Sequence, residues 1–231
     1  MIHQFIFAGP RPGWVAERFQ QYWLHTHAIH YASKIRQIRQ YLVAPRIRLP
    51  GLAREVPFFE GVAEIWIRNA AEQLESLQSE EFLKGARLDE PNWAAFWQTF
   101  VHESVSEVTL GESSPAASLF KIYLFLKRRA GLDLAAFHDE LRGSVKDRAH
   151  ALPGISRHLL APARDELYGL GEPRFDAIEV LGFPEQRQCL KALGSDSWQE
   201  LTRRVINMVD SRYFFVFTGR DNWIIRPGER P

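Results

Sequence analysis

The best candidates for catalytic or ligand-binding residues lie between Phe19 and Ala28, where a tyrosine, a tryptophan and two histidines are close in sequence. Trp23 and His27 are four residues apart, so on a helix they share one face. A histidine, with an ordinary pKa of about 6.5, can accept or donate a proton near neutral pH. The spacing predicts that Trp23 packs on the ring of a ligand while His27 acts as general acid or base.

A structural role for His27 explains the same pattern. Near the end of a helix an imidazole commonly binds a backbone carbonyl and stabilises the local fold. The sequence leaves both interpretations open. His25 points to another side of the helix, and it is interpreted, together with His30, as solvated or structural. The series His-x-His-x-x-His lacks the i, i+4 pair of a helical zinc site, so no metal is expected.

Two further catalytic candidates lie in predicted strands. Glu64 stands among apolar residues, where burial would raise the pKa of its carboxyl group and make it a pocket acid; pairing with an arginine at a sheet edge is the alternative. His102 shares a strand face with Phe100 and could orient a polar group. Tyr22 and Tyr41 could donate a hydrogen bond to a substrate oxygen, or simply pack in the core.

Aromatic residues make up 13% of the chain, including 7 Trp and 16 Phe. They are numerous enough to line an apolar cavity for a flat ligand, or to fill a core. Besides Trp23, the candidates for such a lining are Phe5, Phe7, Trp66, Phe96, Trp97 and Phe100. The chain has no phosphate-binding loop, dinucleotide fingerprint or serine nucleophile elbow. Cys189 has no histidine near it in sequence, so a nucleophilic role is not expected.

Apolar periodicity outlines a scaffold for these candidates. The predicted strands of the first half are Ile2–Ala8, Ile38–Ile47, Phe59–Ile67 and Phe100–Leu110. Helices are predicted over Trp14–His27, from a cap at Asn69 to Lys84, and around Asn92–Trp97. The resulting order, β-α-β-β-α-β, is that of ferredoxin-like domains.

The pattern starts again after the small-residue linker Gly111–Ala117. A shift of about 118 positions places Ile2 on Phe120, Gly13 on Gly131 and Phe19 on Phe137, while Ile38–Pro45 falls on Ile155–Pro162 and Glu64 roughly on Glu179. This series predicts a tandem duplication, with repeats over residues 1–110 and 118–231.

The first predicted strand is apolar on both faces, since His3, Phe5 and Phe7 alternate with Gln4 and Ile6. Helices cover only one face of such a sheet, so the other face needs a second cover. Two sheets that pack face to face or close into a barrel supply it. The fold class is therefore predicted as α+β, with two tandem ferredoxin-like β-α-β-β-α-β repeats forming one barrel inside the chain.

A family resemblance rests on the first half and extends into the second. The residues that carry it are the motif Phe19-x-x-Tyr22-Trp23-x-x-x-His27-Ala28, the strands Ile38–Pro45 and Gly61–Trp66, and the segment Phe120–Pro162. Together they resemble the EthD family of the dimeric α+β barrel superfamily. The resemblance implies an intramolecular dimeric α+β barrel. The superfamily includes cofactor-free monooxygenases, polyketide cyclases, decarboxylases, lactone isomerases and haem enzymes.

The two predicted copies differ at the candidate site. His27 aligns with Val145, and Trp23 aligns with Leu141. The histidine of the motif is present in the first half alone. The comparison predicts an active first repeat and a degenerate second repeat.

Composition restricts the partners. The chain has 29 basic and 28 acidic residues and a formal net charge of +1, which gives no reason to expect nucleic acid or a membrane surface. One cysteine excludes an internal disulfide and fits a reducing compartment. No apolar run spans a bilayer and the N-terminus lacks signal-peptide features, so a cytoplasmic monomer (a pseudo-dimer) or homodimer is predicted.

The predicted function is that of a small cofactor-independent enzyme of the lyase, cyclase, isomerase or monooxygenase type. It would act on an aromatic or polyketide-like small molecule through proton transfer by His27. Two alternatives stay open: a non-catalytic small-molecule-binding or stress-response protein, and a haem-dependent enzyme.

Overall fold

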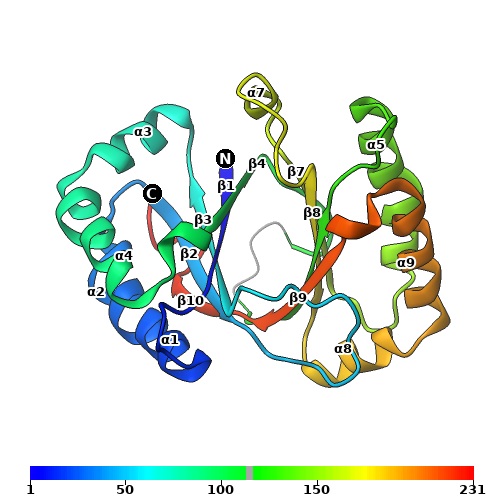
Figure 1. Cartoon of the computed structure of the whole chain (residues 1–231), viewed down its shortest axis with the longest axis horizontal. Helices are drawn as coiled ribbons and strands as arrows, with labels where there is room; N and C mark the ends of the chain where they lie inside the picture. The colour runs from blue at the N-terminus through cyan, green and yellow to red at the C-terminus, as the bar shows by residue number, and fades with distance from the viewer. Residues whose placement is uncertain (113–116) are drawn as a thin grey trace. The chain divides into compact units, whose positions relative to one another are not determined.

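The computed structural model describes residues 1–112 and 117–231, so residues 113–116 of the predicted linker lie outside it. The chain forms two compact units. Unit 1 comprises Met1–Ile47, Pro57–Glu103 and Gly219–Pro231, and unit 2 comprises Arg48–Val56 and Ser104–Thr218. Each unit is an α+β structure in which helices cover one face of a five-stranded sheet (Figure 1).

The sheet of unit 1 has the strand order β10-β2-β3-β1-β4. Its strands are β1 (Ile2–Ala8), β2 (Ile38–Pro45), β3 (Gly61–Ile67), β4 (Phe100–Ser104) and β10 (Asn222–Ile225). β1 and β2 both pair with β3 in antiparallel fashion, with Phe5 and Leu42 on either side of Glu64.

The first helical segment of unit 1 runs almost as predicted. It consists of α1 (Ala16–Tyr22), a π-helical turn (Trp23–His27) and α2 (Ala28–His30), followed by a 3-10 turn (Ala32–Lys34). π-Helical turns are rare and frequently mark functional sites. This one contains both Trp23 and His27.

The second helical segment differs from its prediction. α3 (Ala70–Gln78) is capped by Asn69, whose side chain accepts a hydrogen bond from the Glu72 N–H at 3.0 Å. The helix stops at Ser79, which is extended, and whose hydroxyl accepts from the Phe82 N–H. A π-helical turn (Glu81–Ala86), α4 (Arg87–Trp93) and a 3-10 turn (Phe96–Gln98) follow. The predicted helix from Asn69 to Lys84 is therefore interrupted at Ser79, where the serine cap starts a second helical segment that continues past Lys84 to Trp93.

Unit 2 repeats this plan with the strand order β5-β7-β8-β6-β9. Its strands are β5 (Glu107–Leu110), β6 (Phe120–Leu126), β7 (Arg157–Pro162), β8 (Ala177–Phe183) and β9 (Phe215–Arg220). Its helices are α5 (Leu134–Glu140), a π-helical turn (Leu141–Val145), α6 (Lys146–His150), α7 (Asp165–Tyr168), α8 (Gln186–Leu193), α9 (Asp196–Met208) and a 3-10 turn (Ser211–Tyr213).

Two predicted strands, Phe100–Leu110 in the first half and Arg212–Ile225 in the second, each form two strands that belong to different sheets. Within the predicted strand Phe100–Leu110, β4 stays in the first sheet, whereas β5 pairs with β7 of the second. Likewise, β9 lies in the second sheet and β10 pairs with β2 of the first. An edge strand offers unpaired backbone groups to any segment that reaches it. Each sheet thus takes its fifth strand from the other half of the sequence.

Both faces of β1 are buried, as its composition predicted. Phe5 and Phe7 on one face are fully buried, and Gln4 and Ala8 on the other are also buried. The predicted match of Glu64 with Glu179 is wrong by one residue. Phe5 pairs with Glu64, but Tyr123, its counterpart at a shift of 118, pairs with Val180. None of the helices in the described part of the chain is long and apolar enough to cross a bilayer.

Candidate functional site

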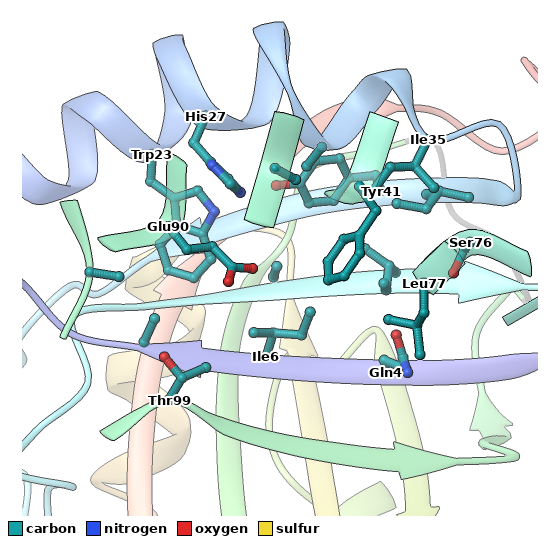
Figure 2. A pocket seen from close by; sticks show the side chains of 18 of the residues that line it. Gln4, Ile6, Trp23, His27, Ile35, Tyr41, Ser76, Leu77, Glu90 and Thr99 are labelled. Atoms are coloured by element: carbon teal, nitrogen blue, oxygen red, sulfur yellow. The ribbon is translucent and has the colours of Figure 1, made fainter. Parts of the chain in front are cut away.

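A cavity of about 140 Å³ lies in unit 1 between its sheet and its helices (Figure 2). About 10–15 Å³ of such space holds one water molecule, so the cavity accommodates a small organic molecule. Strand residues with small or branched side chains form its floor, among them Ile6, Ala8, Ala63 and Ile65. The lining is mostly apolar, which suits the burial of a flat hydrocarbon surface.

Trp23 enters this cavity because β3 begins with a glycine. A Cβ atom at Gly61 would lie 2.7 Å from the Trp23 ring, closer than real Cβ contacts allow. The ring also packs against Phe19 and Trp93, with centroids 5.4 and 4.9 Å away. Complete burial raises the pKa of the Tyr41 hydroxyl, and hydrogen bonding from Trp23 acts in the opposite direction. Tyr41 therefore keeps its own proton and can donate it.

His27 lies one helical turn after Trp23 and is also buried. Its Nδ1 is 2.9 Å from Oδ2 of Asp89, which is 4% exposed and belongs to α4. Oδ1 of Asp89 accepts hydrogen bonds from the Tyr22 hydroxyl at 2.8 Å and from the Asn92 amide at 3.3 Å. A carboxylate oxygen accepts hydrogen bonds from such donors. Asp89 is therefore placed to act as an acceptor toward His27.

The position of the His27 proton follows from these partners. The Trp93 Nε1 also lies 3.2 Å from Nδ1, but a ring nitrogen cannot accept from an indole while it donates to a carboxylate. We assign the proton to Nδ1, because the ionised Asp89 is the stronger partner. Nε2 then carries the lone pair. Figure 2 shows the His27 ring extending from its helix into the cavity.

Burial lowers the pKa of His27, and the hydrogen bond and charge of Asp89 act in the opposite direction. The lowered pKa means that His27 is neutral at pH 7, the form that a general base requires. Burial, followed by the hydrogen bond to Asp89, raises the pKa of Tyr22 to about 12, so its hydroxyl remains a donor. The site therefore combines a neutral imidazole with a charged carboxylate behind it.

Glu90 adds a second titratable group to the cavity wall. Burial raises the pKa of its carboxyl group, and the nearby Arg87, which donates to Oε2 at 2.9 Å, moderates the rise. Figure 2 shows its carboxyl group directed into the cavity on the same side as His27. A carboxyl group with a raised pKa can hold a proton at higher pH than a solvated one.

The structure brings four of the predicted residues together in this cavity, namely Trp23, His27, Tyr41 and Phe96. Tyr22 lies behind them and acts on His27 through Asp89.

The candidates from the other face of the sheet are not part of this cavity. There Glu64 pairs with His3 at 3.0 Å, and the His3 ring stacks on Trp66. Phe5 lies against His102, with ring centroids 6.1 Å apart, and Phe7 lies against Phe59. Strand alternation explains the separation, because neighbouring residues of β1 and β3 point to opposite faces.

Trp97 is 70% exposed and does not line the cavity, whereas its neighbour Phe96 does. His25 and His30 are exposed, in agreement with their interpretation as solvated residues.

Sequence reasoning missed Asp89, Trp93 and Glu90. Asp89 and Trp93 are four residues apart and share the face of α4 that meets His27. The signal was the spacing Asp-x-x-x-Trp, but the predicted helix ended before it. An acid in a polar run such as Arg87–Asn92 also looks solvated until its partner 62 residues away is known.

Comparisons with known proteins agree with this architecture. Residues 11–96 match the model of the EthD domain family. An anthrone oxidase-like protein matches with a TM-score of 0.65 and 11% identity, over 96% of this chain and 90% of its own. A protein from Lactobacillus acidophilus NCFM, described as a presumed monooxygenase, matches with a TM-score of 0.56 and 12% identity, over 96% and 94%. A chlorite dismutase variant from Candidatus Nitrospira defluvii matches with a TM-score of 0.51 and 14% identity, over 96% and 91%. No curated protein matched the sequence.

At these identities the solved structures show the fold and leave the chemistry to the site itself. The match to the EthD model covers α1, the His27 turn, β2, β3 and the helix that carries Asp89. The chain has the α+β fold of the dimeric α+β barrel proteins, and its residues 11–96 are similar to the EthD domain.

Proposed function

We propose that unit 1 is an enzyme site in which His27 removes a proton from a flat aromatic or polyketide-like small molecule. The observation that carries this proposal is the 2.9 Å hydrogen bond between His27 Nδ1 and Asp89 Oδ2 at the wall of an apolar cavity. The structural neighbours described as a monooxygenase, an anthrone oxidase-like protein and a chlorite dismutase support an enzymatic role.

In the proposed step the Nε2 lone pair of His27 takes a proton from an acidic C–H or O–H group. Asp89 holds the imidazole in the required tautomer and stabilises the imidazolium that forms. Trp23 packs on the ring of the substrate, and the Tyr41 hydroxyl donates to the oxygen on which negative charge develops. Glu90, if protonated, can return a proton to the product.

This proton transfer is the common first step of cyclisation, isomerisation, lyase chemistry and oxygenation. Which reaction follows depends on the enolate or phenolate that the substrate forms. No cofactor is required for the proton transfer itself. A small-molecule partner, a cytoplasmic location and a monomeric or homodimeric state complete the prediction.

Anthrone is a suitable test molecule, because its C10–H is acidic and the chain shares its fold with an anthrone oxidase-like protein. In D2O without oxygen, the purified protein should speed deuterium incorporation at C10, which mass spectrometry measures. With oxygen present, anthrone and O2 would give anthraquinone and water, which absorbance follows. The anaerobic assay isolates the proton transfer from the later oxidation.

Replacing His27 is the decisive variant. His27→Ala should slow deuterium exchange by about 10²- to 10⁴-fold. His27→Gln keeps a donor for Asp89, so it guards against misfolding, and His25→Ala is the matched exposed control. Binding of anthrone without exchange would overturn the catalytic role and favour a binding protein. A Soret band in the purified protein would contradict a cofactor-independent enzyme.

A further inference from the structure

The end of the cavity away from His27 is polar. Gln4 of β1 lines it, together with Gln73 and Ser76 of α3. Figure 2 shows Gln4, Ser76 and Leu77 grouped at this end, and His27, Trp23 and Glu90 at the other, with Tyr41 and Ile6 between them. A ligand that spans the cavity meets polar groups at both ends and apolar walls between them.

The orientation of the Gln4 amide is fixed by its partner. Its Nε2 donates to Oε1 of Glu103 on β4 at 2.6 Å. Gln73 Nε2 donates to the same carboxylate oxygen. The carboxylate oxygen accepts from both amides, so each amide faces it with its nitrogen. The amide oxygen of Gln4 is therefore turned away from Glu103.

In this orientation the cavity favours a ligand that carries a hydrogen-bond donor. Figure 2 shows the amide oxygen of Gln4 directed into the cavity and the nitrogen directed away from it. Gln4 is only 9% exposed, so water reaches it poorly. A buried carbonyl oxygen gains from a hydrogen-bond donor and loses when a ligand presents an apolar group or another acceptor.

From this geometry we propose that unit 1 selects flat aromatic molecules that carry a hydrogen-bond donor, such as a phenolic hydroxyl, at the end remote from His27. Gln4 is the residue that recognises the donor, and Glu103 is a positioning residue that holds the Gln4 amide with its oxygen inward. The inference rests on the proposed function in one respect, which is that the same cavity binds the substrate.

Three naphthalenes test this proposal by isothermal titration calorimetry. 2-Naphthol has one hydroxyl for the His27 end. 2,6-Dihydroxynaphthalene adds a hydrogen-bond donor at the end remote from His27. 6-Methoxy-2-naphthol carries a hydrogen-bond acceptor, and no donor, at that same end. The dihydroxy compound should bind about three- to tenfold more tightly than 2-naphthol, as expected for one net hydrogen bond. The methoxy compound should bind more weakly than the dihydroxy compound.

Two variants assign the effect to Gln4 and Glu103. Gln4→Met, which keeps the length of the side chain, should abolish the advantage of the dihydroxy compound over 2-naphthol. Glu103→Gln can donate as well as accept, so the Gln4 amide can turn over. In that variant the preference for hydroxyl over methoxy should shrink or reverse, which simple loss of packing would not cause.

Other outcomes contradict the proposal. Equal affinity of the protein for the dihydroxy and methoxy compounds would overturn donor recognition. So would a Gln4→Met variant that weakens all three ligands equally. If none of the three binds, the cavity is not a site for flat aromatics, and the proposed function fails with it. If all three bind with no preference while anthrone still exchanges its proton through His27, only the donor recognition fails.

Discussion

The two units share one fold but use the space between helices and sheet differently. In unit 1 this space is the cavity of about 140 Å³, whereas a cavity between Leu141 and Leu160 in unit 2 measures about 10 Å³. The helix positions of Trp23 and His27 are taken by Leu141 and Val145, which are buried in the core of unit 2. The cavity of unit 1 thus has no counterpart of similar size between Leu141 and Leu160, so its size is not inherent in the fold.

Three alanines account for much of the difference. Ala8, Ala32 and Ala63 line the cavity of unit 1. At the same places in unit 2, judged from the 118-residue shift and the strand register, stand Leu126, His150 and Glu179. Larger side chains at these positions occupy the space that alanine leaves open.

Two of these residues, His150 and Glu179, stand at the ends of a hydrogen-bond chain. Glu179 Oε1 is 2.9 Å from His158 Nε2, and His158 Nδ1 is 2.6 Å from the Thr109 hydroxyl, which lies 2.9 Å from His150 Nε2. Glu179 and His158 are fully buried. Each group in this series can donate to the next, from His150 to Thr109 to His158 to Glu179. The second unit therefore uses its imidazoles in a hydrogen-bonded core, whereas the first places the His27 imidazole at the wall of a cavity.

The largest effect that would test this contrast is expected from Asp89→Asn. The asparagine amide can donate to Nδ1 of His27 and thereby force the proton onto Nε2, which no longer acts as a base. Anthrone exchange should fall by about 10²-fold or more. Tyr22→Phe removes only one hydrogen-bond donor to Asp89, so the rate of anthrone exchange should fall less than tenfold. Full activity in Asp89→Asn would show that the pair in unit 1 is structural, like that of unit 2.

Next in size is His158→Ala in unit 2. It leaves the Glu179 carboxylate buried without its imidazole partner, so the free energy of unfolding should drop by about 3–5 kcal/mol. Anthrone exchange by the folded protein should not change. Arg203→Ala, which breaks an exposed ion pair with Glu200, is the control. It should lower the free energy of unfolding by about 0–1 kcal/mol. Urea denaturation measures the free energy of unfolding of both variants. A loss of anthrone exchange in folded His158→Ala would contradict the proposal that unit 1 alone carries the exchange site.

Ala63→Leu makes unit 1 resemble unit 2 in bulk. The leucine should fill the cavity floor, weaken 2-naphthol binding at least tenfold and leave the melting temperature unchanged or slightly higher, since a void is filled. Ala71→Leu, at an exposed position of α3, is the matched control. Calorimetry measures the affinity for 2-naphthol, and thermal melting measures the melting temperature of each variant. Unchanged binding by Ala63→Leu would mean that the ligand binds elsewhere.

The smallest expected effect is in the pH dependence. Since burial lowers the pKa of His27 below its ordinary 6.5, the neutral base persists below pH 6.5, and exchange should be lost only as pH falls through the lowered value. The stability that neutral His27 contributes is present above pH 6.5 and is lost over the same descent. Asp89 raises this pKa, so Asp89→Asn should move the acid limb of any residual exchange still lower. An acid limb above pH 6.5 would contradict the buried neutral imidazole.

Much of the scaffold was predictable because its signals are local. The apolar runs Ile2–Ala8 and Phe120–Leu126 each form the expected strand, and the helix through His27 forms nearly as the 3.6-residue spacing indicates. The split of Phe100–Leu110 into β4 and β5 was not predictable in this way. Both pieces have strand character, and only the available sheet edges decide where each one pairs.

The sequence by itself determined the duplicated β-α-β-β-α-β order, the EthD resemblance and the pairing of Trp23 with His27 on one helical face. These depend on neighbours a few residues apart. The tertiary structure alone decided that Asp89 supports His27, that Glu64 and His102 lie on the opposite face of the sheet, and that Gln4 turns its oxygen inward. Those outcomes depend on strand register and on partners dozens of residues away, which no local periodicity encodes.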